Sequence, residues 1–483
     1  MHTLLRKLRV PFPPGNYNTR FARKKSGLRR AGASRLRAAF LFMYFFYRGL
    51  TALSMLVLAP YYAFRGWRRG EARAWRERFG ALPRTIASDR MASKDDSPIW
   101  IHAVSVGEVL AAKPLAEGLK RRMPKRPIYV STTTETGQRL ARERLRCADG
   151  VFYFPLDWVF SVRRALRQMR PALVVIMETE IWPNFLREAR KLGIGVVFAN
   201  ARISERSFAR YNRWKFLTLE FYTEVMRDPD LFLAQTPEDA ERLMAMGAPE
   251  ERVEVAGNLK YDGEPPPMTA LGSWLAGQIA AQERWPVLVA GSVVAQEEEA
   301  VLAAYDIVQR RFRRALLVLA PRKPDRFDAA ADVVEAGGWR LVRRSRIDLS
   351  APLAEDADVL LLDSIGELAG LYSLADAVFV GGSLVPAGGH NILESAWFGR
   401  VPVFGGSMEN FREMADRFLS AHAAVQVHSG PDLGKVWLQL IEGASLRERM
   451  GQAARELWER NRGATRRCLD RIAAVLENDR RTA

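Results

Sequence analysis

Short apolar runs alternate with longer stretches of helical periodicity after residue 96. The runs have the length of buried β-strands, and the stretches between them have the length of crossover helices. This alternation predicts βαβ units and parallel sheets, which define the α/β fold class. The predicted strands form two series, at residues 98–103, 127–132, 150–154, 173–177, 195–199 and 231–234, then at 287–290, 315–320, 339–342, 359–362, 377–380 and 401–404.

A proline-rich stretch at residues 263–267 separates the two series and predicts a linker. A chain of 483 residues is also too long for a single core. We therefore expect two doubly wound, Rossmann-like domains at residues 97–264 and 280–445, followed by C-terminal helices at 446–483. Ligands of such sheets bind beyond the carboxyl ends of the strands, so we expect these ends to face a shared cleft.

The N-terminal region has a different pattern, because residues 38–64 are apolar except for Arg48. About 20 apolar residues are enough to cross a bilayer as a helix. A charge near the middle of a span costs at least ~2.5 kcal/mol, so a helix that lies in the membrane interface fits equally well. Residues 38–80 are therefore predicted to be a membrane-anchoring helical segment, either spanning the bilayer or lying on it.

Charge supports a membrane-facing N-terminus. The net charge is +18, and eleven Lys or Arg residues, with no acidic residue, lie in the first 37 positions. This basic arm at residues 1–37 is predicted to be disordered and to favour an anionic membrane surface. Nucleic acid is the alternative partner of such an arm. We expect no specific nucleic-acid binding, because the charge adjoins an apolar segment instead of lining a fold.

Cysteine usage is sparse. Only Cys147 and Cys468 are present, so the sequence has neither a disulfide framework nor the cysteine spacing of a metal site. A cleaved signal peptide is not expected either, because no small-residue cleavage site follows the apolar run. We expect the folded domains on the cytoplasmic face of the inner membrane.

Carboxylates follow two strands of the first series. Glu108 comes after the first strand, beside Gly107 at a predicted strand-to-helix turn, where a raised pKa would suit a general base. The alternative is a first-turn glutamate that stabilises its helix. Glu178 and Glu180 follow the fourth strand and need a cation partner, either Lys260 or Arg202. A purely structural salt bridge remains the alternative there.

Anion-binding patterns follow three strands of the second series. Arg322 can grip a phosphate or a carboxylate in bidentate fashion. The stretch at residues 363–368 offers helix-start amides and the carboxylate of Glu367. The glycine-rich segment at 381–394 predicts a strand, a tight turn and a helix whose first amides seat a phosphate, with Glu394 reaching a ribose diol. A plain αβ connection is the alternative, so the segment suggests a nucleotide-linked substrate.

Taken in order, these pieces resemble one family. The motifs HAVSVGE, TTTETG, METEIWPN, NARISERS, GNLKYD, APRKPDRF, DSIGEL and GGSLVPAGGHNILE are similar to those of the 3-deoxy-D-manno-octulosonic acid (Kdo) transferases, from about Ile99 to the C-terminus. The resemblance implies a GT-B fold, a CMP-Kdo donor, a lipid A precursor as acceptor and inversion at the anomeric carbon. It implies neither a metal nor a cofactor for the transfer step.

The resemblance also implies roles for single residues. Glu108 matches the catalytic base, and Glu178 and Lys260 match a pair that steadies the transition state. The residues that match the CMP-binding stretches are Pro321, Arg322, Gly366, Glu367, Leu368, Asn391, Ile392, Leu393 and Glu394.

Departures from the family pattern lie on the donor side. A Ser-Thr-His-Glu-Gly-Glu-Glu run is replaced by the sequence from Ser292 to Glu298, and Lys323 stands where a histidine is usual. Two alternatives therefore stay open. One is a GT-B transferase for a different nucleotide sugar. The other is an inactive membrane scaffold, although a scaffold has no need of Glu108, Lys260 and Arg322.

Overall fold

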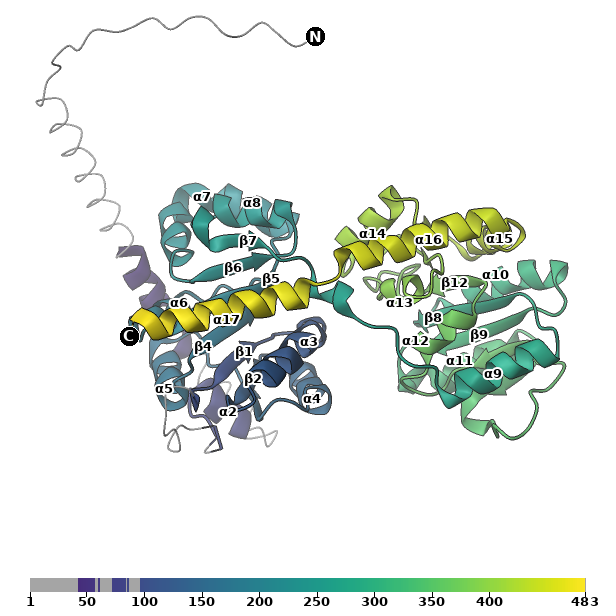
Figure 1. Cartoon of the computed structure of the whole chain (residues 1–483), viewed down its shortest axis with the longest axis horizontal. Helices are drawn as coiled ribbons and strands as arrows, with labels where there is room; N and C mark the ends of the chain where they lie inside the picture. The colour runs from purple at the N-terminus through teal and green to yellow at the C-terminus, as the bar shows by residue number, and fades with distance from the viewer. Residues whose placement is uncertain (1–41, 57–59, 61–71, 84, 87–95, 483) are drawn as a thin grey trace, which may run out of the picture. The chain divides into compact units, whose positions relative to one another are not determined.

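The computed structural model describes residues 42–56, 60, 72–83, 85–86 and 96–482 (Figure 1). These residues form two compact units. Unit 1 comprises the described residues up to Ala256 together with those from Cys468 onward, and unit 2 comprises Gly257–Arg467. The predicted basic arm at 1–37 lies outside the described residues, as does much of the predicted anchor.

Unit 1 contains a seven-stranded sheet in the order β3-β2-β1-β4-β5-β6-β7. Every pairing in it is parallel. Apolar side chains on both faces of most strands are buried, as expected for a sheet covered by helices on both sides. The strands are β1 Ile99–His102, β2 Ile128–Thr132, β3 Gly150–Tyr153, β4 Leu173–Met177, β5 Gly195–Ala201, β6 Leu231–Ala234 and β7 Val253–Val255.

Serine and threonine begin several helices of unit 1, because their side chains accept a hydrogen bond from an otherwise unpaired first-turn amide. Ser105, Thr134, Ser204 and Thr236 have this role. The last helix of the chain returns to unit 1, where Arg122 pairs with Asp470 at 2.7 Å. The helices are α2 Ala72–Arg78, α3 Val106–Arg122, α4 Glu135–Arg144, α5 Val159–Met169, α6 Pro183–Lys191, α7 Glu205–Val225, α8 Pro237–Ala245 and α17 Ala464–Thr482, with a 3-10 turn η2 Glu250–Arg252.

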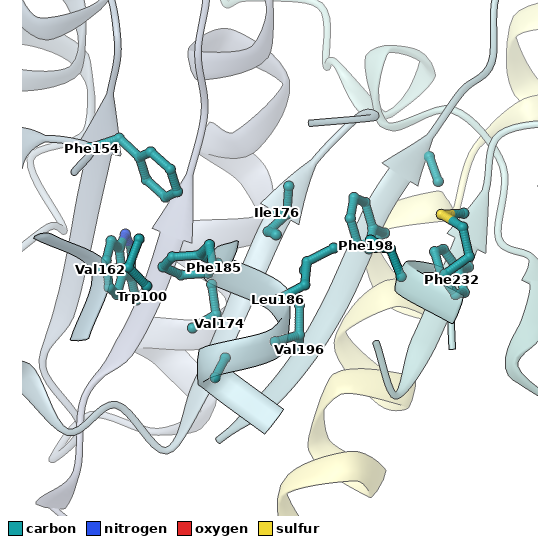
Figure 2. Close-up of a cluster of buried hydrophobic side chains, with 14 of the residues drawn as sticks. Trp100, Phe154, Val162, Val174, Ile176, Phe185, Leu186, Val196, Phe198 and Phe232 are labelled. Carbon is teal, nitrogen blue, oxygen red and sulfur yellow. The ribbon is translucent and has the colours of Figure 1, made fainter. Parts of the chain in front are cut away.

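The core of unit 1 is rich in aromatic rings (Figure 2). Trp100 of β1 meets Phe185 of α6 edge to face, with ring centroids 5.1 Å apart. Phe198 and Phe232 stack at 5.1 Å across β5 and β6. Truncating a buried aromatic side chain to Ala costs about 3–5 kcal/mol. This cluster therefore fixes the central strands, and with them the loops that leave their carboxyl ends.

Unit 2 contains a second parallel seven-stranded sheet, in the order β10-β11-β9-β8-β12-β13-β14. Successive residues of its strands alternate between two apolar clusters: Val289 and Val378 belong to one, and Leu288 and Phe379 to the other. Because side chains alternate across a strand, this sheet is buried on both faces. The strands are β8 Val287–Val293, β9 Leu316–Pro321, β10 Leu341–Arg343, β11 Val359–Leu361, β12 Ala377–Val380, β13 Val403–Phe404 and β14 Val425–Gln426.

The first α-helix of unit 2 precedes its first strand, and the others come after it. These α-helices are α9 Ala270–Ala281, α10 Glu298–Arg311, α11 Phe327–Ala336, α12 Leu368–Leu371, α13 Leu393–Ala396, α14 Arg412–Ser420, α15 Gly430–Glu442 and α16 Ala444–Asn461. Its 3-10 turns are η3 Leu259–Asp262, η4 Pro324–Arg326, η5 Arg344–Arg346 and η6 Tyr372–Leu374. The two predicted parallel sheets are thus confirmed, with β7 and β14 as additional short strands.

Residues 42–56 form a helix whose two sides differ. On one side, Tyr44 is buried in the core of unit 1, the Tyr47 hydroxyl donates to Asp157 at 2.8 Å, and Arg48 pairs with Glu188 of α6 at 2.5 Å. On the other side, six apolar side chains are 54–75% exposed: Phe42, Phe45, Phe46, Leu50, Leu53 and Leu56. Among the described ranges, no helix combines the length and apolar character needed to cross a bilayer.

Candidate active site

Each sheet has one place where the order of the strands reverses. In unit 1 this switch point lies between β1 and β4, which are neighbours in the sheet but not in the chain. The loops that follow such a pair of strands diverge and leave a crevice at the sheet edge. Glu108 follows β1, and Glu178 follows β4. The structure therefore brings these two predicted residues to the same switch point.

Glu108 is held in the first turn of α3. One oxygen of its carboxylate accepts from the Val104 amide at 2.8 Å, and the other accepts from the Ser105 hydroxyl at 2.8 Å. Ser105 in turn caps α3, so the two residues form the reciprocal arrangement of a capping box. The first-turn role considered for Glu108 is therefore present, and it fixes the position of the carboxylate without excluding chemistry at it.

Electrostatics raise the proton affinity of Glu108. The side chain is only 6% exposed. Burial raises the pKa of its carboxyl, the amide of Val104 opposes this rise, and the charge of Glu178 adds to it. A carboxylate with a raised pKa is a stronger proton acceptor than an ordinary glutamate.

The loop after β4 carries a third carboxylate. Burial, followed by the charges of Glu108 and Glu178, raises the pKa of Glu180 to about 7. Glu178 itself has a left-handed backbone with φ of 52°, a conformation that few side chains adopt without a structural or functional reason. The Thr179 hydroxyl bonds to the backbone carbonyl of Arg202 and thereby ties the loop to the end of β5. Glu108, Glu178 and Glu180 therefore act on one another as a cluster of like charges, the acidic cluster.

Asp157 stabilises the end of this loop, where α6 begins. Helix α6 begins at Pro183, and Trp182 before it offers no side-chain cap. Asp157 supplies the missing acceptor, since its carboxylate accepts from the amides of Asn184 at 3.1 Å and Phe185 at 2.8 Å. Burial raises the pKa of Asp157 to about 6. Sequence reasoning missed Asp157, because its partners lie in other elements and no local pattern marks it.

The surroundings of His102, in the HAVSVGE motif, indicate a structural role for this residue. Its ring is buried, stacks on Phe154 with centroids 3.8 Å apart, and makes a 2.9 Å contact between Nδ1 and the Ser131 hydroxyl. Burial lowers the pKa of His102 to about 3. The imidazole is therefore neutral at physiological pH and packs the base of the β1 loop.

Lys260, the third predicted catalytic residue, belongs to unit 2. It lies in η3, where its amide donates to the Asn258 side chain at 3.0 Å. Its ammonium group lies 5.3 Å from the centre of the Phe411 ring, within the range of a cation–π contact. The adjacent Asp262 accepts from the amides of Gly463 and Thr465 at the start of α17.

The switch point of unit 2 lies between β8 and β12. Pro321 ends β9, beside β8, and the exposed Arg322 follows it. Burial lowers the pKa of His390 to about 4, and the charge of Arg322 acts in the same direction. Burial raises the pKa of Glu394, while Asn391 and Arg322 oppose the rise. The influence of its charge on His390 and Glu394 indicates that Arg322 lies near the Asn391–Glu394 stretch.

The stretch Gly366–Leu368 differs in part from expectation. The carboxylate of Glu367 is already paired within the protein, because two nitrogens of Arg344 donate to it at 3.0 and 3.2 Å. Helix α12 spans only Leu368–Leu371. Leu368 does lie beside β8. A Cβ atom built on Gly291 of that strand would come within 3.1 Å of the Leu368 side chain.

The glycine-rich segment requires a correction. Strand β12 is as predicted, but the helix that follows is only α13 Leu393–Ala396, and Glu394 lies in its first turn. The amides of Gly382, Ser383 and Leu384 are not available to a phosphate, because they donate to the carboxylate of Glu297. Sequence reasoning missed Glu297, although Glu297 and Glu298 are the retained part of the altered family motif.

The altered motif contains a backbone position that favours glycine. Gln296 has a left-handed conformation with φ of 74° at the position where the family pattern has glycine. Glycine adopts this conformation freely, whereas other L-residues pay about 1–2 kcal/mol. Glycine would therefore occupy this position with less strain than the glutamine that is present.

Metal binding finds no support among the described residues, which contain no group of three or more His, Cys, Asp or Glu side chains arranged to hold an ion. Cys147 and Cys468 are both free thiols.

Two parallel sheets with charged loops at their switch points define a two-domain α/β protein of the GT-B type. A solved structure with this fold is a putative UDP-N-acetylglucosamine 2-epimerase from Listeria monocytogenes, which aligns with a TM-score of 0.51 at 12% identity over 80% of this chain and 97% of that chain.

Sequence comparison gives the family. The family model for 3-deoxy-D-manno-octulosonic-acid transferase (kdotransferase) matches residues 73–263. The chain is 35% identical to a 3-deoxy-D-manno-octulosonic acid transferase of Haemophilus influenzae, over 79% of this chain and 88% of the relative. It is 33% identical to the Bordetella pertussis transferase of the same name, over 88% of this chain and 98% of that relative. The chain belongs to the Kdo transferase family and is a glycosyltransferase.

Proposed function

We propose that this Kdo transferase uses CMP-Kdo as its donor and a lipid A precursor as its acceptor, with inversion at the anomeric carbon. The observation that carries the proposal is the buried Glu108 carboxylate, fixed by Val104 and Ser105 at the switch point of unit 1 beside two further carboxylates. An acceptor hydroxyl needs a positioned proton acceptor when it attacks a sugar carbon. Glu108 has the burial, the fixed geometry and the raised pKa for this role.

The proposed step is a direct displacement. The acceptor oxygen forms a bond to the anomeric carbon of Kdo while its proton passes to Glu108. The bond between that carbon and the CMP phosphate oxygen breaks, and CMP leaves with the electron pair. Glu178 and Lys260 are assigned to steadying the transition state through the family resemblance, and Lys260 is contributed by unit 2.

On the donor side, Arg322 is proposed to neutralise the phosphate of CMP. Support comes from its place after β9 and from its electrostatic influence on both His390 and Glu394. An arginine fork matches phosphate oxygens in bidentate fashion. Asn391 and Glu394 then lie where a ribose or a base can meet them, next to the guanidinium that holds the phosphate.

The experiment that tests this function incubates the purified protein with CMP-Kdo and a defined lipid A precursor. We expect release of CMP and a glycolipid whose mass has increased by whole Kdo units, measured by mass spectrometry. Glycolipid formed from another nucleotide sugar, with none formed from CMP-Kdo, would instead support the alternative donor.

We also propose that the helix at 42–56 rests in the interface of an anionic membrane, on the cytoplasmic face of the inner membrane. Six large apolar side chains are exposed on one side of it, and such exposed apolar groups mark protein or membrane interaction sites, whereas Tyr47 and Arg48 hold the opposite side to unit 1. The ion pair between Arg48 and Glu188 explains how a charge is accommodated within this apolar helix.

Cations accompany this helix on the surface of unit 1. Beside Glu188 on α6, Arg187, Arg190 and Lys191 line a cavity of about 350 Å³ together with Arg227, Glu224 and Asp228. Each basic residue near an anionic bilayer contributes about 1 kcal/mol of attraction. These four cations pair with carboxylates of unit 1, namely Asp228, Glu188 and Glu224, so only part of their charge is available to an anionic bilayer. The exposed apolar side of the helix is therefore the main support for the membrane proposal.

Vesicle flotation tests the membrane proposal. We expect the protein to float with vesicles that contain phosphatidylglycerol and to float less with pure phosphatidylcholine. Replacing Phe45, Leu53 and Leu56 by Ser should abolish flotation, whereas Met268→Ser, an exposed apolar residue of unit 2, should not. Equal flotation of the triple variant and its parent would show that another segment binds the membrane.

A further inference from the structure

The carboxylate of Glu297 lies within a ring of backbone amides in unit 2. One oxygen accepts from the amides of Ser383 and Leu384, both at 2.8 Å. The other accepts from Gly382 at 2.6 Å and from Val294 at 3.0 Å. The side chain is completely buried. Successive amides that converge in this way form an anion-binding nest, of the kind that holds phosphate in many proteins.

Here the nest already contains an anion. A buried carboxylate is costly unless hydrogen bonds replace its lost hydration, and bonds from amides to a charged acceptor are stronger than neutral ones. Four amides satisfy the carboxylate of Glu297. The carboxylate in turn satisfies amides of the glycine-rich loop that would otherwise be buried without an acceptor.

Glu297 spans the switch point of unit 2. It follows β8 and immediately precedes α10, whereas its loop partners follow β12, 85 residues further along the chain. The approach is so close that a Cβ at Gly381 would lie 2.9 Å from the Glu297 carboxylate and 2.7 Å from the Cα of Val293. Glycine at 381 is therefore a steric requirement of this contact.

The contact continues to the predicted donor residues. The Gly389 amide donates to the Gly382 carbonyl at 2.6 Å, so the two ends of the loop are joined. The Gly388 amide donates to the Ser407 hydroxyl at 2.9 Å. His390 and Asn391 follow directly. A shift of the residues that Glu297 holds would therefore move the backbone that carries Asn391 and Glu394.

We propose that Glu297 is a resident anion that fills the nest of the glycine-rich loop and is a positioning residue for the sugar-nucleotide site. This inference rests on the proposed function for its ligand. It changes the expected chemistry, because the amides of residues 382–384 do not bind the donor phosphate. We therefore assign binding of that phosphate to Arg322 and to the backbone after Gly389. Glu297 fixes the position of this backbone.

Chemical rescue of Glu297→Ala tests the inference. The substitution leaves four converging amides without an acceptor, so a small carboxylate added to the solution can take the vacant place. We expect KM for CMP-Kdo to rise by about tenfold or more, the scale of lost charge-assisted hydrogen bonds, and sodium formate to restore it in part. Sodium chloride at equal ionic strength should not. Formate should have no effect on the parent protein.

A second readout does not depend on the reaction. Formate should raise the melting temperature of Glu297→Ala and leave that of the parent unchanged, because it binds the folded variant alone. If the parent releases no CMP from CMP-Kdo, the proposed donor is wrong, but this stability test still decides the role of Glu297. A folded Glu297→Ala that formate neither stabilises nor activates would overturn the inference.

Glu297→Gln serves if the alanine variant does not fold. Glutamine has nearly the same shape, but its NH2 group would face amide donors in place of an acceptor oxygen. We expect a higher KM for CMP-Kdo in this variant and no effect of formate, since the site stays filled. An unchanged KM would contradict the positioning role. Glu299→Ala, an exposed neighbour on α10, is the matched control and should behave as the parent.

Discussion

The two units have similar sheets but treat the carboxylates at their switch points in opposite ways. In unit 1, Glu108, Glu178 and Glu180 act on one another as like charges, and the pKa values of Glu108 and Glu180 are raised by burial and by that repulsion. In unit 2, backbone amides surround the carboxylate of Glu297. Equivalent positions in the two sheets thus hold a carboxylate that is repelled by neighbouring carboxylates, Glu108, and a carboxylate that is satisfied by hydrogen bonds, Glu297.

The difference indicates a division of labour. A carboxylate whose charge is poorly compensated accepts a proton readily, which suits the unit that activates the acceptor hydroxyl. A carboxylate held by several amides is fixed in place, which suits a unit that must hold a ligand in one position. The same strand order can therefore serve proton transfer or ligand positioning, depending on which groups face the switch-point carboxylate.

The acidic cluster is most directly tested by Glu108→Gln. Glutamine can still accept the Val104 amide hydrogen bond, so the fold should persist while the base is lost. We expect turnover to fall by about 10³-fold, within the range for a lost general base, with CMP-Kdo binding unchanged. Steady-state kinetics and donor titration provide the measurement. Glu117→Gln on the outer surface of α3 is the control, and turnover by Glu108→Gln close to that of the control would remove the assigned base.

The donor side of the comparison is tested at Arg322. Arg322→Ala should raise KM for CMP-Kdo by about 10- to 100-fold, since a charge-assisted bidentate contact contributes roughly 1.5–3 kcal/mol. Turnover at saturating donor should change less. Lys323→Ala supplies the comparison, as the neighbouring exposed cation. If both variants lose donor affinity equally, phosphate binding is shared and the assignment to Arg322 alone is wrong.

Sequence patterns predicted the strands well because a parallel strand buried on both faces is a continuous apolar run. The runs at 173–177, 231–234 and 377–380 match β4, β6 and β12 residue for residue. Strands β7 and β14 were missed, since they contain only three and two residues and Glu254 and Gln426 interrupt their apolar character.

The site was predicted less completely, for a different reason. Glu108, Glu178 and Arg322 follow predicted strands directly, so the topology alone brings them to the right sheet edges. Asp157 and Glu297 act on partners that lie 27 and 85 residues away in the chain. No local pattern marks such contacts, so the sequence did not indicate that a carboxylate of the protein itself holds the amides of Gly382, Ser383 and Leu384.

A smaller effect is expected from Glu180→Gln, which removes one charge from the acidic cluster. The folded protein holds the proton of Glu180 up to a pKa of about 7, whereas an unfolded glutamate loses it near 4.5. The raised pKa therefore destabilises the fold as pH rises through this window. After a discount for solvent screening, the variant should be about 1–2 kcal/mol more stable than its parent above pH 7 and equal to it below pH 4.5.

Urea unfolding across this pH range provides the measurement for Glu180→Gln. Glu205→Gln, an exposed residue in the first turn of α7, is the control and should show no such pH-dependent gain. A constant difference between Glu180→Gln and its parent at all pH values would mean that Glu180 is not strained, and the contrast between the two switch points would then depend on Glu108 alone.

The smallest expected effect concerns the link between the helix at 42–56 and the acidic cluster. Tyr47 donates to Asp157, whose carboxylate also accepts two amides at the start of α6, directly after the loop that carries Glu178 and Glu180. Tyr47→Phe removes one of these three hydrogen bonds and should cost about 1 kcal/mol of unfolding free energy. Tyr44→Phe is the comparison on the same helix, where the hydroxyl lies 3.4 Å from Arg48. If the helix also positions the loop, Tyr47→Phe will raise KM for the lipid acceptor and leave KM for CMP-Kdo unchanged, whereas an equal change in both would show that the helix serves stability alone.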